Sequence, residues 1–489
     1  MTKADPSLQP KSKTKLKPKP ELLWTVDEIV AATGGRILGK PKKVKGISID
    51  SRTVAKGDLF IATKGDQFDG HDFVDQALEA GAAAAMVSAD QVERMAVPRA
   101  GLIVVKDSYD GLYDLARASR ARSSAKIIAI TGSVGKTSTK ETFRLILSGF
   151  GKTHAPVKSF NNHWGVPLTL CRMPRDTEFG VFEIGMNSAN EITPLSKLVE
   201  PHVAMITTVA PVHLENLGSL DAIAAAKAEI FDGLLPGGTA VVHGDIVHTA
   251  FLKERAQEAG AGKVMTFGHG AGHDAELMQV ALLPDCSSVD AKIAGQQITY
   301  KVGAPGEHLV INSLGVLAVC AALGLDLAHA GLALARIEQP EGRGRRFTLD
   351  TPGDPVTLLD ESYNANPTSV RAALAVLARL PLGNRGRRVA VLGDMLELGD
   401  EASTMHADLG RDIATLGIDR VYACGPLMKA LWRVVPVDKR GVYAESSDGL
   451  KPALATDIAP GDAVMIKGSL GSRMGPLVEM LRSRYEDRH

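Results

Sequence analysis

The feature that most constrains this chain is a short apolar run, residues 126–130, which leads through a glycine-rich turn into a helix-forming segment. The run is rich in isoleucine, a composition typical of a strand covered on both faces in a parallel sheet. Gly132 and Gly135 in the turn allow the backbone to fold closely around an anion, with its N–H groups pointing inward. The helix, expected from Thr139 to Leu147, adds the positive end of its dipole at the same place. The sequence therefore predicts a phosphate-binding loop between a buried strand and a helix.

The residues of this loop also carry the side chains that a bound nucleoside triphosphate requires. Lys136 can reach the outer phosphates, and the hydroxyl of Thr137 is placed to bind Mg²⁺. The loop has a short form of the phosphate-binding motif, because Ile130 stands where the general motif has its first glycine. On its own, the loop does not distinguish a kinase, an ATPase, a GTPase or a ligase. We expect all of its residues to contact the nucleotide: Gly132, Ser133, Val134, Gly135, Lys136, Thr137 and Ser138.

Length and composition indicate an ordinary globular chain. Its 489 residues, of which 45% are hydrophobic and 23% charged, suffice for about three domains. Lys plus Arg and Asp plus Glu both number 56, so no net field favours nucleic acid or an anionic membrane as a partner. The 4 cysteines are scattered, without the spacing of a zinc site or a disulfide framework, which favours a reducing compartment. We therefore expect a cytoplasmic protein that does not bind nucleic acid.

The beginning of the chain and its longest apolar stretch bear on membranes. Residues 1–20 are rich in lysine and proline and lack an apolar segment, so we expect residues 1–23 to form a disordered basic tail rather than a secretory signal. Residues 314–325 form the longest apolar stretch, which is too short to span a bilayer and is bounded by Asn312 and Asp326. We interpret this stretch as a buried helix and expect no membrane span.

Along the rest of the chain, apolar runs alternate with helical segments, which favours parallel sheets and doubly wound α/β domains. We expect an α/β fold of three domains: a small α/β N-terminal domain at 24–122, a central P-loop domain with a parallel sheet at 123–345, and a C-terminal Rossmann-like domain at 346–489. At the start of the N-terminal domain, we expect a helix over residues 21–33. Ligands of such sheets bind beyond the carboxyl ends of the strands. Polar clusters fall at these ends: Glu183, His213, Asp360 with Glu361, Asp394 and Lys467.

Glu183 and His213 are candidate metal ligands next to the loop. Glu183 stands near the end of a predicted strand, residues 179–184, and His213 follows another that ends at Val209. Both side chains should emerge on the face that holds the glycine-rich loop, where a carboxylate and an imidazole could hold a second metal ion beside Thr137. Taken singly, each also fits a structural role, Glu183 as a salt-bridged strand end and His213 as an ordinary loop histidine.

Lys227 occupies an unusual position in a predicted helix, residues 220–234, which begins after the N-cap candidate Ser219. An ammonium group on a core-facing stripe is disfavoured unless it is paired or chemically altered. The side chain could reach solvent past neighbouring alanines, or it could lie inside the site and carry a carbamate that binds metal. The residues leave both possibilities open. The stripe that Lys227 shares is otherwise apolar: Leu220, Ile223, Ile230, Phe231 and Leu234.

Several motifs, in this order, resemble those of the Mur ligases, the ATP-dependent amide-forming enzymes of peptidoglycan precursor synthesis. In the central part they are the loop from Thr131 to Lys140, Asn161-Asn-His-Trp-Gly-Val-Pro167, Glu183-Ile-Gly-Met-Asn187, His213-Leu-Glu215 and Ala225-Ala-Lys-Ala-Glu-Ile230. In the C-terminal part they are Gly342-Arg343, Asp360-Glu-Ser-Tyr-Asn-Ala-Asn-Pro-Thr-Ser369, Leu392-Gly-Asp-Met-Leu-Glu-Leu-Gly399 and Lys467-Gly-Ser469. The resemblance covers nearly everything except the basic tail. Its C-terminal motifs are similar to the branch of the family that adds D-alanyl-D-alanine to UDP-N-acetylmuramoyl-tripeptide.

The resemblance implies roles for the residues around the loop. Lys136, His213 and Lys227 are expected to act in catalysis. Thr137 and Glu183 are expected to hold Mg²⁺, with His213 helping at a second ion and Lys227 carrying a CO₂-derived carbamate. The family also implies ATP as cofactor, UDP-N-acetylmuramoyl-tripeptide and D-alanyl-D-alanine as small-molecule substrates, and a monomer.

The resemblance further implies which residues hold the nucleotide and the substrate. Asn312 is expected to contact adenine, and Arg343 to reach the phosphates from a hinge. Glu361 or its neighbour Asp360 is expected to hold the ribose. Ser51 and Arg52 stand where the family holds the UDP-sugar, and Asn162 is expected at the substrate. Three positions depart from the family's pattern: Leu309 where Asn is common, Glu361 where Asp is frequent, and His163-Trp164 in place of an acidic–aliphatic pair.

The chemistry of these residues suits amide formation. Forming an amide from a carboxylate at neutral pH requires an activated acyl group, which the γ-phosphate of ATP supplies as an acyl phosphate. Lys136 and the metal ions would offset the charge that gathers on the phosphates. Closure of the last domain would exclude the water that hydrolyses acyl phosphates.

Other interpretations remain in view. The chain could be another ligase of the same superfamily, either a diamino-acid-adding Mur ligase or a folylpolyglutamate synthase. The Asp-Asn-Pro-Arg signature of the diamino-acid-adding enzyme is absent from the sequence. Residues 357–361, Thr-Leu-Leu-Asp-Glu, imitate the Walker B strand of a remodelling ATPase, against which the neutral charge and the 4% aromatic content weigh. A scaffold protein that kept the fold could have lost any of the candidate residues, yet all are present.

Overall fold

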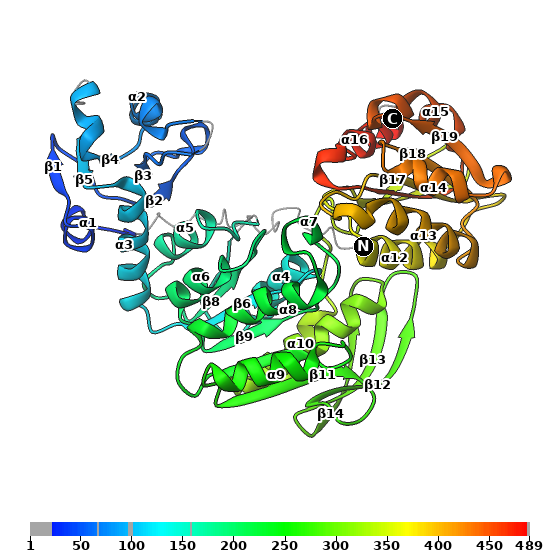
Figure 1. The fold of residues 1–489 in the computed structure, drawn as a ribbon, viewed down its shortest axis with the longest axis horizontal. Helices are drawn as coiled ribbons and strands as arrows, with labels where there is room; N and C mark the ends of the chain where they lie inside the picture. The colour runs from blue at the N-terminus through cyan, green and yellow to red at the C-terminus, as the bar shows by residue number, and fades with distance from the viewer. Residues whose placement is uncertain (1–21, 66–67, 96–100, 157–158, 487–489) are drawn as a thin grey trace, which may run out of the picture. The chain divides into compact units, whose positions relative to one another are not determined.

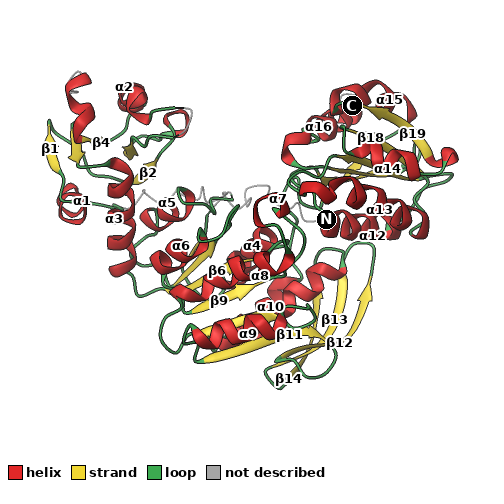
Figure 2. Cartoon of the chain, in the orientation of Figure 1, coloured by secondary structure: helices red, strands yellow, loops and turns green. Residues whose placement is uncertain are grey.

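The computed structural model describes residues 22–65, 68–95, 101–156 and 159–486. The predicted disordered tail, residues 1–23, lies outside these ranges except for Leu22 and Leu23. Helices and strands alternate along the described chain and build three sheets, which confirms the expected α/β fold (Figures 1 and 2). The chain divides into two compact units, one ending at Ala118 and the other beginning at Ser119, and each is described by itself. The predicted domain bounds, 24–122, 123–345 and 346–489, stay predictions.

The first unit holds a five-stranded sheet in the order β1-β5-β4-β3-β2, in which β1 alone runs antiparallel to its neighbour. The helix predicted for residues 21–33 begins later. Its N-cap Thr25 forms a capping box with Glu28, while the backbone of Trp24 pairs with Val44 and is therefore not helical. The strands are β1 (Arg36–Leu38), β2 (Gly46–Ser48), β3 (Asp58–Ile61), β4 (Ala84–Ser88) and β5 (Leu102–Val105); the helices are α1 (Val26–Thr33), α2 (Val74–Glu79) and α3 (Ser108–Ala121), which continues into the second unit.

The second unit begins with a nine-stranded sheet in the order β14-β13-β12-β11-β10-β9-β6-β8-β7. The strands from β7 to β12 are parallel to one another, whereas β13 and β14 are antiparallel, so the sheet predicted as parallel is mixed at one edge. The strands are β6 (Lys126–Thr131), β7 (Thr153–His154), β8 (Phe179–Glu183), β9 (Val203–Ile206), β10 (Thr239–His243), β11 (Lys263–His269), β12 (Ala275–Leu282), β13 (Ser287–Ile293) and β14 (Gln296–Val302).

Helices cover both faces of this sheet (Figure 1). α4 (Lys136–Leu147), α10 (Glu307–Ala322) and α11 (Leu327–Leu334) share one core with the strands, to which Ile128, Phe143 and Leu314 belong. The apolar stretch predicted as a buried helix lies largely within α10, which confirms its burial. α5 (Gly165–Cys171), α6 (Ile192–Val199) and α9 (Thr249–Glu258) contact β8, β6 and β10 from the other side. In the part of the chain that the structure describes, no helix is both long and apolar enough to cross a membrane.

A six-stranded sheet follows in the order β15-β16-β20-β17-β18-β19, with β15 antiparallel to β16 and the other neighbours parallel, as expected for a Rossmann-like sheet. α12 (Pro367–Arg379), α13 (Ala402–Thr415) and α14 (Met428–Val434) pack on one face, and α15 (Lys451–Asp457) and α16 (Gly475–Glu486) on the other. The strands are β15 (Arg345–Leu349), β16 (Val356–Glu361), β17 (Arg388–Gly393), β18 (Arg420–Cys424), β19 (Arg440–Ala444) and β20 (Ala463–Lys467).

The register of the nine-stranded sheet gathers the candidate residues at one edge. Ile130 of β6 pairs with Glu183 of β8, and Thr131 pairs with Ile206 of β9. Because these strands are parallel, the segments that follow them leave the sheet at the same edge. The glycine-rich loop, Glu183 and the segment that leads to His213 therefore start from neighbouring strand ends.

The helix that carries Lys227 is shorter than predicted. α8 spans Leu220–Ala228, and a 3-10 segment, Glu229–Gly233, replaces the predicted continuation to Leu234. The carboxylate of Glu229 accepts hydrogen bonds from the backbone N–H groups at the start of α6, which ties the chain down where the α-helix ends. Leu220 is 40% exposed and lies off the buried stripe. The remaining members of the predicted stripe are buried: Ile223, Lys227, Ile230, Phe231 and Leu234.

Candidate active site

The glycine-rich loop is held by the segment that follows β9. Gly132 has φ 151°, and a Cβ there would lie 1.9 Å from Oγ1 of Thr207, which donates a hydrogen bond to the carbonyl oxygen of Val134 at 2.6 Å. Oγ of Ser133 donates to the carbonyl oxygen of Ala210 and accepts from its N–H, both at 2.9 Å. Gly135, with φ 89°, is the N-cap of α4, which begins earlier than the predicted Thr139. The two glycines are thus required by the backbone, as predicted for a loop that folds around an anion.

Lys136 folds back over this loop. Its Nζ donates a hydrogen bond to the carbonyl oxygen of Gly132 at 2.5 Å. Burial lowers the pKa of Lys136; the carboxylate of Glu183 opposes this shift, and the guanidinium of Arg343 adds to it. The lysine therefore lies close to one carboxylate and one further cation, at the mouth of the loop.

Oxygen atoms converge beside Thr137. Its Oγ1 donates to the Glu183 carboxylate, at 3.0 and 3.2 Å from the two oxygens, and lies 3.3 Å from Oγ of Ser159. Nδ2 of Asn161 donates to Oε1 of Glu183 at 2.8 Å. Glu183 is 1% exposed, and among the described residues no Lys, Arg or His forms an ion pair with it. The alternative role of Glu183 as a salt-bridged strand end is therefore not what the structure shows.

This arrangement fits a hard cation. A buried carboxylate that forms no ion pair with a described residue, next to two hydroxyl oxygens, offers the ligands that Mg²⁺ prefers. Within the described ranges, no group of three or more His, Cys, Asp or Glu side chains forms a metal cluster. A metal ion at Thr137 and Glu183 would therefore need hydroxyl ligands, phosphate oxygens or a modified side chain in addition.

Lys227 is buried near Lys136. Its side chain is 2% exposed, so it does not reach solvent past the neighbouring alanines. Burial, and to a lesser extent the charge of Lys136, lowers the pKa of Lys227 well below its ordinary value. No hydrogen bond or ion pair to its Nζ is found in the described part of the chain. The environment favours the neutral amine, which is the nucleophilic form.

His213 stands between these lysines and the six-stranded sheet. It is the N-cap of α7 (Leu214–Leu217), with φ 55°, and its Nδ1 lies 2.5 Å from Oε2 of Glu397. Burial lowers the pKa of His213; Glu397 opposes this shift, and Lys136 and Lys227 add to it. The structure thus brings His213 to the region of both lysines, as predicted.

The residues expected to hold the nucleotide lie around the same loop. A Cβ at Gly135 would lie 2.6 Å from Nδ2 of Asn312, so this amide borders the loop. A nitrogen of Arg343 donates to Oγ of Ser159 at 3.4 Å, and its guanidinium carbon lies 4.0 Å from the ring centroid of Tyr363. Ser138 contacts Gln339 at 3.5 Å through its Oγ.

The two ribose candidates differ in how they are engaged. Oδ2 of Asp360 accepts from the N–H of Gly342 at 2.7 Å, and Oδ1 accepts from the N–H and the hydroxyl of Ser362. Oε2 of Glu361 pairs with Nζ of the buried Lys467 at 3.1 Å. Both Asp360 oxygens therefore already accept hydrogen bonds, whereas Glu361 keeps one oxygen that its pair with Lys467 does not use.

Two predicted substrate residues, Ser51 and Arg52, belong to the first unit. Arg52 forms two hydrogen bonds of 2.8 Å with the carboxylate of Asp50, which raises its pKa, and Oγ of Ser51 donates to Gln76 at 3.2 Å. A third, Asn162, uses its side-chain oxygen to accept from the N–H groups of Trp164 and Gly165 at the start of α5. Their substrate-binding roles stay predictions.

Several side chains of the site were not predicted. Asn161 and Ser159 contact the Thr137–Glu183 pair, Tyr363 lies under Arg343, and Glu397 contacts His213. Asn161, Tyr363 and Glu397 stand inside recognised motifs, so their positions in the sequence could have suggested them. Nothing in the sequence connects Glu397 to His213, because the two residues lie on different sheets.

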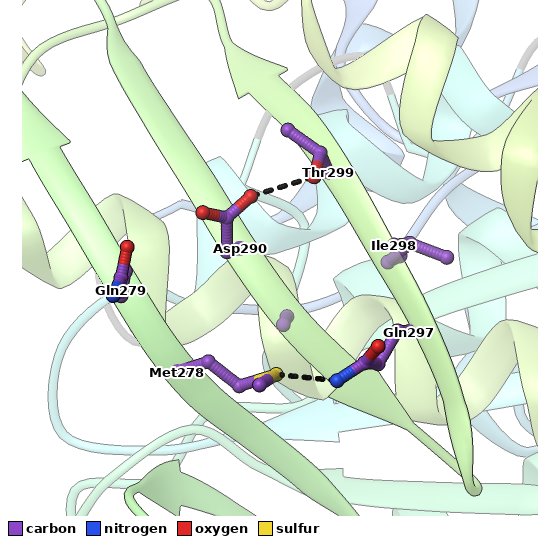
Figure 3. A pocket seen from close by; sticks show the side chains of 7 residues that line it. Met278, Gln279, Asp290, Gln297, Ile298 and Thr299 are labelled. Carbon is purple, nitrogen blue, oxygen red and sulfur yellow. Dashed lines mark hydrogen bonds between the residues drawn. The ribbon is translucent and has the colours of Figure 1, made fainter.

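A hollow elsewhere on the nine-stranded sheet contains none of these residues. It has a volume of about 460 Å³ and lies over β12, β13 and β14 (Figure 3). The carboxylate of Asp290 accepts a hydrogen bond from Thr299 at 2.6 Å, and Gln297 contacts the sulfur of Met278. None of the residues that line the hollow comes from the phosphate-binding edge.

The Walker B interpretation of residues 357–361 is wrong. A Walker B strand lies in the same sheet as the phosphate-binding loop, because its carboxylate must reach the metal beside that loop. Here the segment belongs to β16 in the six-stranded sheet, and Asp360 accepts a hydrogen bond from the N–H of Gly342. The remodelling-ATPase hypothesis therefore loses its main support.

Comparisons with known proteins show the family of the chain. Three family models match the chain: "Mur ligase family, catalytic domain" at residues 43–120, "Mur ligase middle domain" at 130–320 and "Mur ligase, glutamate ligase domain" at 344–470. The UDP-N-acetylmuramoyl-tripeptide–D-alanyl-D-alanine ligase of Bacillus subtilis is 33% identical over 90% of this chain and 93% of its own length. A crystal structure of MurF from Acinetobacter baumannii has a TM-score of 0.82 at 32% identity, covering 94% of this chain and 99% of that one. MurF from Thermotoga maritima, in complex with ADP, has a TM-score of 0.75 at 27% identity, with coverages of 91% and 98%. The chain belongs to the Mur ligase family.

Proposed function

We propose that the chain forms an amide between UDP-N-acetylmuramoyl-tripeptide and D-alanyl-D-alanine, with ATP converted to ADP and phosphate. The observation that carries this proposal is the alignment of 90% of the chain with a relative named for this activity. The glycine-rich loop, with Thr137 against Glu183, supports the use of a nucleotide, as does the ADP in the relative from Thermotoga maritima.

In the first step, an oxygen of the tripeptide carboxylate attacks the γ-phosphorus of ATP. The bond from this phosphorus to the β–γ bridging oxygen breaks, and an acyl phosphate and ADP form. Nζ of Lys136 leaves the Gly132 carbonyl for the transferring phosphoryl group, and Arg343 approaches the same group from its position beside Ser159. Both cations offset the charge of the transition state.

Bound Mg²⁺ would add charge stabilisation on the phosphates. Thr137 and Glu183 would hold one ion, and His213 and Lys227 would contribute to a second. Asn312 would contact adenine, and Glu361, with an oxygen that its pair with Lys467 does not use, would hold the ribose. Ser51, Arg52 and Asn162 would bind the UDP-sugar substrate.

The same proposal gives Lys227 a carbamate. The neutral amine attacks the carbon of CO₂, an N–C bond forms, and the nitrogen loses one proton, so a buried neutral amine becomes an anion. The burial of Lys227 and its lack of an anionic partner favour this change. The carbamate would also supply a carboxylate to a site in which the described residues form no cluster of three acidic, His or Cys ligands.

In the second step, the amine of D-alanyl-D-alanine attacks the acyl carbon, and the tetrahedral intermediate expels phosphate as the amine loses a proton. Water must be excluded, because it would hydrolyse the acyl phosphate. Residues 342–347, which lead from the nine-stranded to the six-stranded sheet, would act as the hinge. A monomer in the cytoplasm belongs to the same proposal; the four cysteines, all described, are free thiols, which suits a reducing compartment.

The test is a panel of acceptors with mass spectrometry of the UDP product. We expect product with UDP-N-acetylmuramoyl-tripeptide, ATP and D-alanyl-D-alanine, and phosphate release that requires all three. Extension of a UDP-muramoyl-dipeptide by a diamino acid, or of a folate by glutamate, would assign the chain to another branch. Phosphate release without an acceptor amine would contradict ligation.

A further inference from the structure

Two non-glycine residues with left-handed backbone conformations face each other in the second unit. His213, at the start of α7, has φ 55°, and Glu397, in the segment between β17 and α13, has φ 64°. Nδ1 of the imidazole lies 2.5 Å from Oε2 of the carboxylate. Such conformations are unfavourable for residues with a Cβ, and they persist where the surrounding structure requires them. The contact thus joins two residues whose backbones the surrounding structure holds in this conformation.

The backbones around this contact also meet. The N–H of Glu215 points at the carbonyl oxygen of Glu397 at 3.5 Å, and a Cβ at Gly399 would lie 3.5 Å from the backbone of Glu215. His213 and Glu215 belong to the segment after β9, whereas Glu397 and Gly399 follow β17 of the other sheet. The contact therefore joins the two sheets of the second unit at one small point.

The imidazole has few other partners. Nδ1 is buried, and its contact with the Glu397 carboxylate does not have the angle of a hydrogen bond. The charge of this carboxylate nevertheless acts on Nδ1 at short range. Among the described residues, none is hydrogen-bonded to Nε2. A carboxylate at one ring nitrogen favours the proton on that nitrogen, which leaves the lone pair of the other nitrogen free to bind a metal or accept a proton.

We propose that Glu397 is a positioning residue for the ligation: it fixes the proton of His213 on Nδ1 and so presents Nε2 as the free nitrogen. This inference rests on the proposed function for its activity readout. Because Glu397 comes from the six-stranded sheet and His213 from the nine-stranded sheet, the imidazole is oriented only while the two sheets are together. Assembly of the site is thereby coupled to the closure that excludes water.

The exposure of the two side chains separates this role from a structural one. The Glu397 side chain is 55% exposed and that of His213 is 23% exposed. An ion pair this exposed contributes little to stability. Removing the carboxylate should therefore leave the folded protein intact and change the state of the imidazole.

The test compares Glu397→Ala and Glu397→Gln with Glu401→Gln. Glu401 is an exposed glutamate at the end of the 3-10 segment Gly399–Glu401, which follows Glu397, and its side chain has no hydrogen bond or ion pair in the described structure. We expect kcat to fall about 10- to 100-fold in Glu397→Ala, as for loss of groups that orient metal-binding histidines. The KM for ATP and the Tm of Glu397→Ala should stay close to wild type. The kcat of Glu397→Gln should lie between those of wild type and Glu397→Ala, and Glu401→Gln should behave as wild type.

The second readout is independent of activity. Histidine labelled with ¹⁵N, in protein without metal or nucleotide, reports which ring nitrogen carries the proton, and His213→Gln identifies the resonance. We expect the Nδ1–H form in wild type and a shift toward Nε2–H in Glu397→Ala. An unchanged tautomer, or a kcat of Glu397→Ala within threefold of wild type, would overturn the inference. Absence of ligation by the wild type itself would instead contradict the proposed function, while the tautomer would still test the contact.

Discussion

Two regions at the carboxyl ends of the nine-stranded sheet gather titratable side chains and differ in how their charges are balanced. At the glycine-rich loop, Lys136 lies near the buried carboxylate of Glu183, and the buried Lys227 lies near Lys136 without an anionic partner among the described residues. At the ends of β10 and β11, one carboxylate, Asp245, is shared by imidazoles. Their ring nitrogens lie 2.9 Å (His269), 3.1 Å (His273) and 3.5 Å (His243) from its oxygens.

The pKa shifts follow from this difference. Burial without a partner lowers the pKa of Lys227 well below its ordinary value. Burial would raise the pKa of Asp245, but hydrogen bonds from His269 and the nearby imidazoles lower it; burial would lower the pKa of His269, but Asp245 and Glu307 raise it. A partnered group keeps its charge and contributes to stability, whereas an unpartnered buried group gives up its charge and becomes reactive. The first region is thus suited to chemistry and the second to stability.

The strongest test of this contrast removes the unpartnered amine. Lys227→Ala should fold and be nearly inactive, because the proposed carbamate is lost. Small added carboxylates should restore part of the turnover if the missing group is an anion. In wild type, stripping CO₂ should lower turnover and bicarbonate should restore it.

Lys140 provides a matched control, since it is also a buried lysine but donates to the carbonyl oxygen of Pro156 at 2.8 Å. Wild-type turnover should respond to bicarbonate, and the turnover of Lys227→Ala should not. An active Lys227→Ala protein, or equal bicarbonate stimulation of both, would remove Lys227 from the mechanism.

The next test concerns the loop. Lys136→Ala removes a charge that acts on the transferring phosphate, and Thr137→Ala removes an oxygen beside Glu183. Loss of one preorganised electrostatic group in such a site lowers turnover about 100- to 1,000-fold. Lys253→Ala, at an exposed lysine on α9, should leave turnover unchanged. Turnover near wild type in both loop variants would make the loop a structural turn only.

A smaller effect is expected on stability. Lys227→Met replaces a buried, unpartnered amine with an apolar side chain of similar length, so the free energy of unfolding should rise by about 1–3 kcal/mol near pH 7. The folded pKa of Lys227 is lowered, so between that pKa and about 10.4 the unfolded chain binds a proton that the folded chain does not. The advantage of Lys227→Met should therefore shrink as pH rises from 7 to 9.5 in urea titrations under CO₂-free conditions. If the advantage of Lys227→Met over wild type were equal at both ends of this pH range, the ammonium would have a partner in solution.

The elements near the loop could be predicted because they depend on local pattern. The buried run 126–130, the two glycines and the following helix are specified by residues adjacent in the sequence, and β6 and α4 form there. Glu183 reaches Thr137 because β8, which ends at Glu183, is the parallel neighbour of β6, which leads through the loop to α4; strand alternation also indicates this pairing. The pattern placed Lys227 on an apolar stripe but left open whether its side chain reaches solvent, and the end of α8 at Ala228 depends on a distant contact of Glu229.

Side chains that meet through long-range packing could not be predicted. The pair of Glu397 with His213 requires the arrangement of two sheets, and the stacking of Arg343 on Tyr363 requires the pairing of β15 with β16; periodicity contains neither. The mixed edge of the central sheet was missed because β13 and β14 alternate as strands do in either direction. The histidines around Asp245 are scattered over residues 243–273, and nothing in their spacing indicates a common partner.

That cluster gives the smallest expected effect and the finest test of the comparison. Asp245 has a lowered pKa, so its contribution to the free energy of unfolding is present above about pH 4 and is lost as pH falls through its folded pKa. His269 has a raised pKa, so its contribution is present below about pH 6.5 and is lost as pH rises through its folded pKa. Asp245→Asn should therefore lower the free energy of unfolding most between about pH 4 and 6.5, by about 0.5–1 kcal/mol after discounting for the half-exposed His269. Burial lowers the pKa of His243 and Asp245 opposes this shift, so the loss of Asp245 also removes support for that imidazole in its charged form. Asp221→Asn, at an aspartate that is 92% exposed and contacts His248 alone at 2.8 Å, is the matched control and should change nothing measurable. If Asp245→Asn lost as much stability at pH 8.5 as at pH 5.5, the cluster would act through packing, and its charges would not distinguish it from the loop.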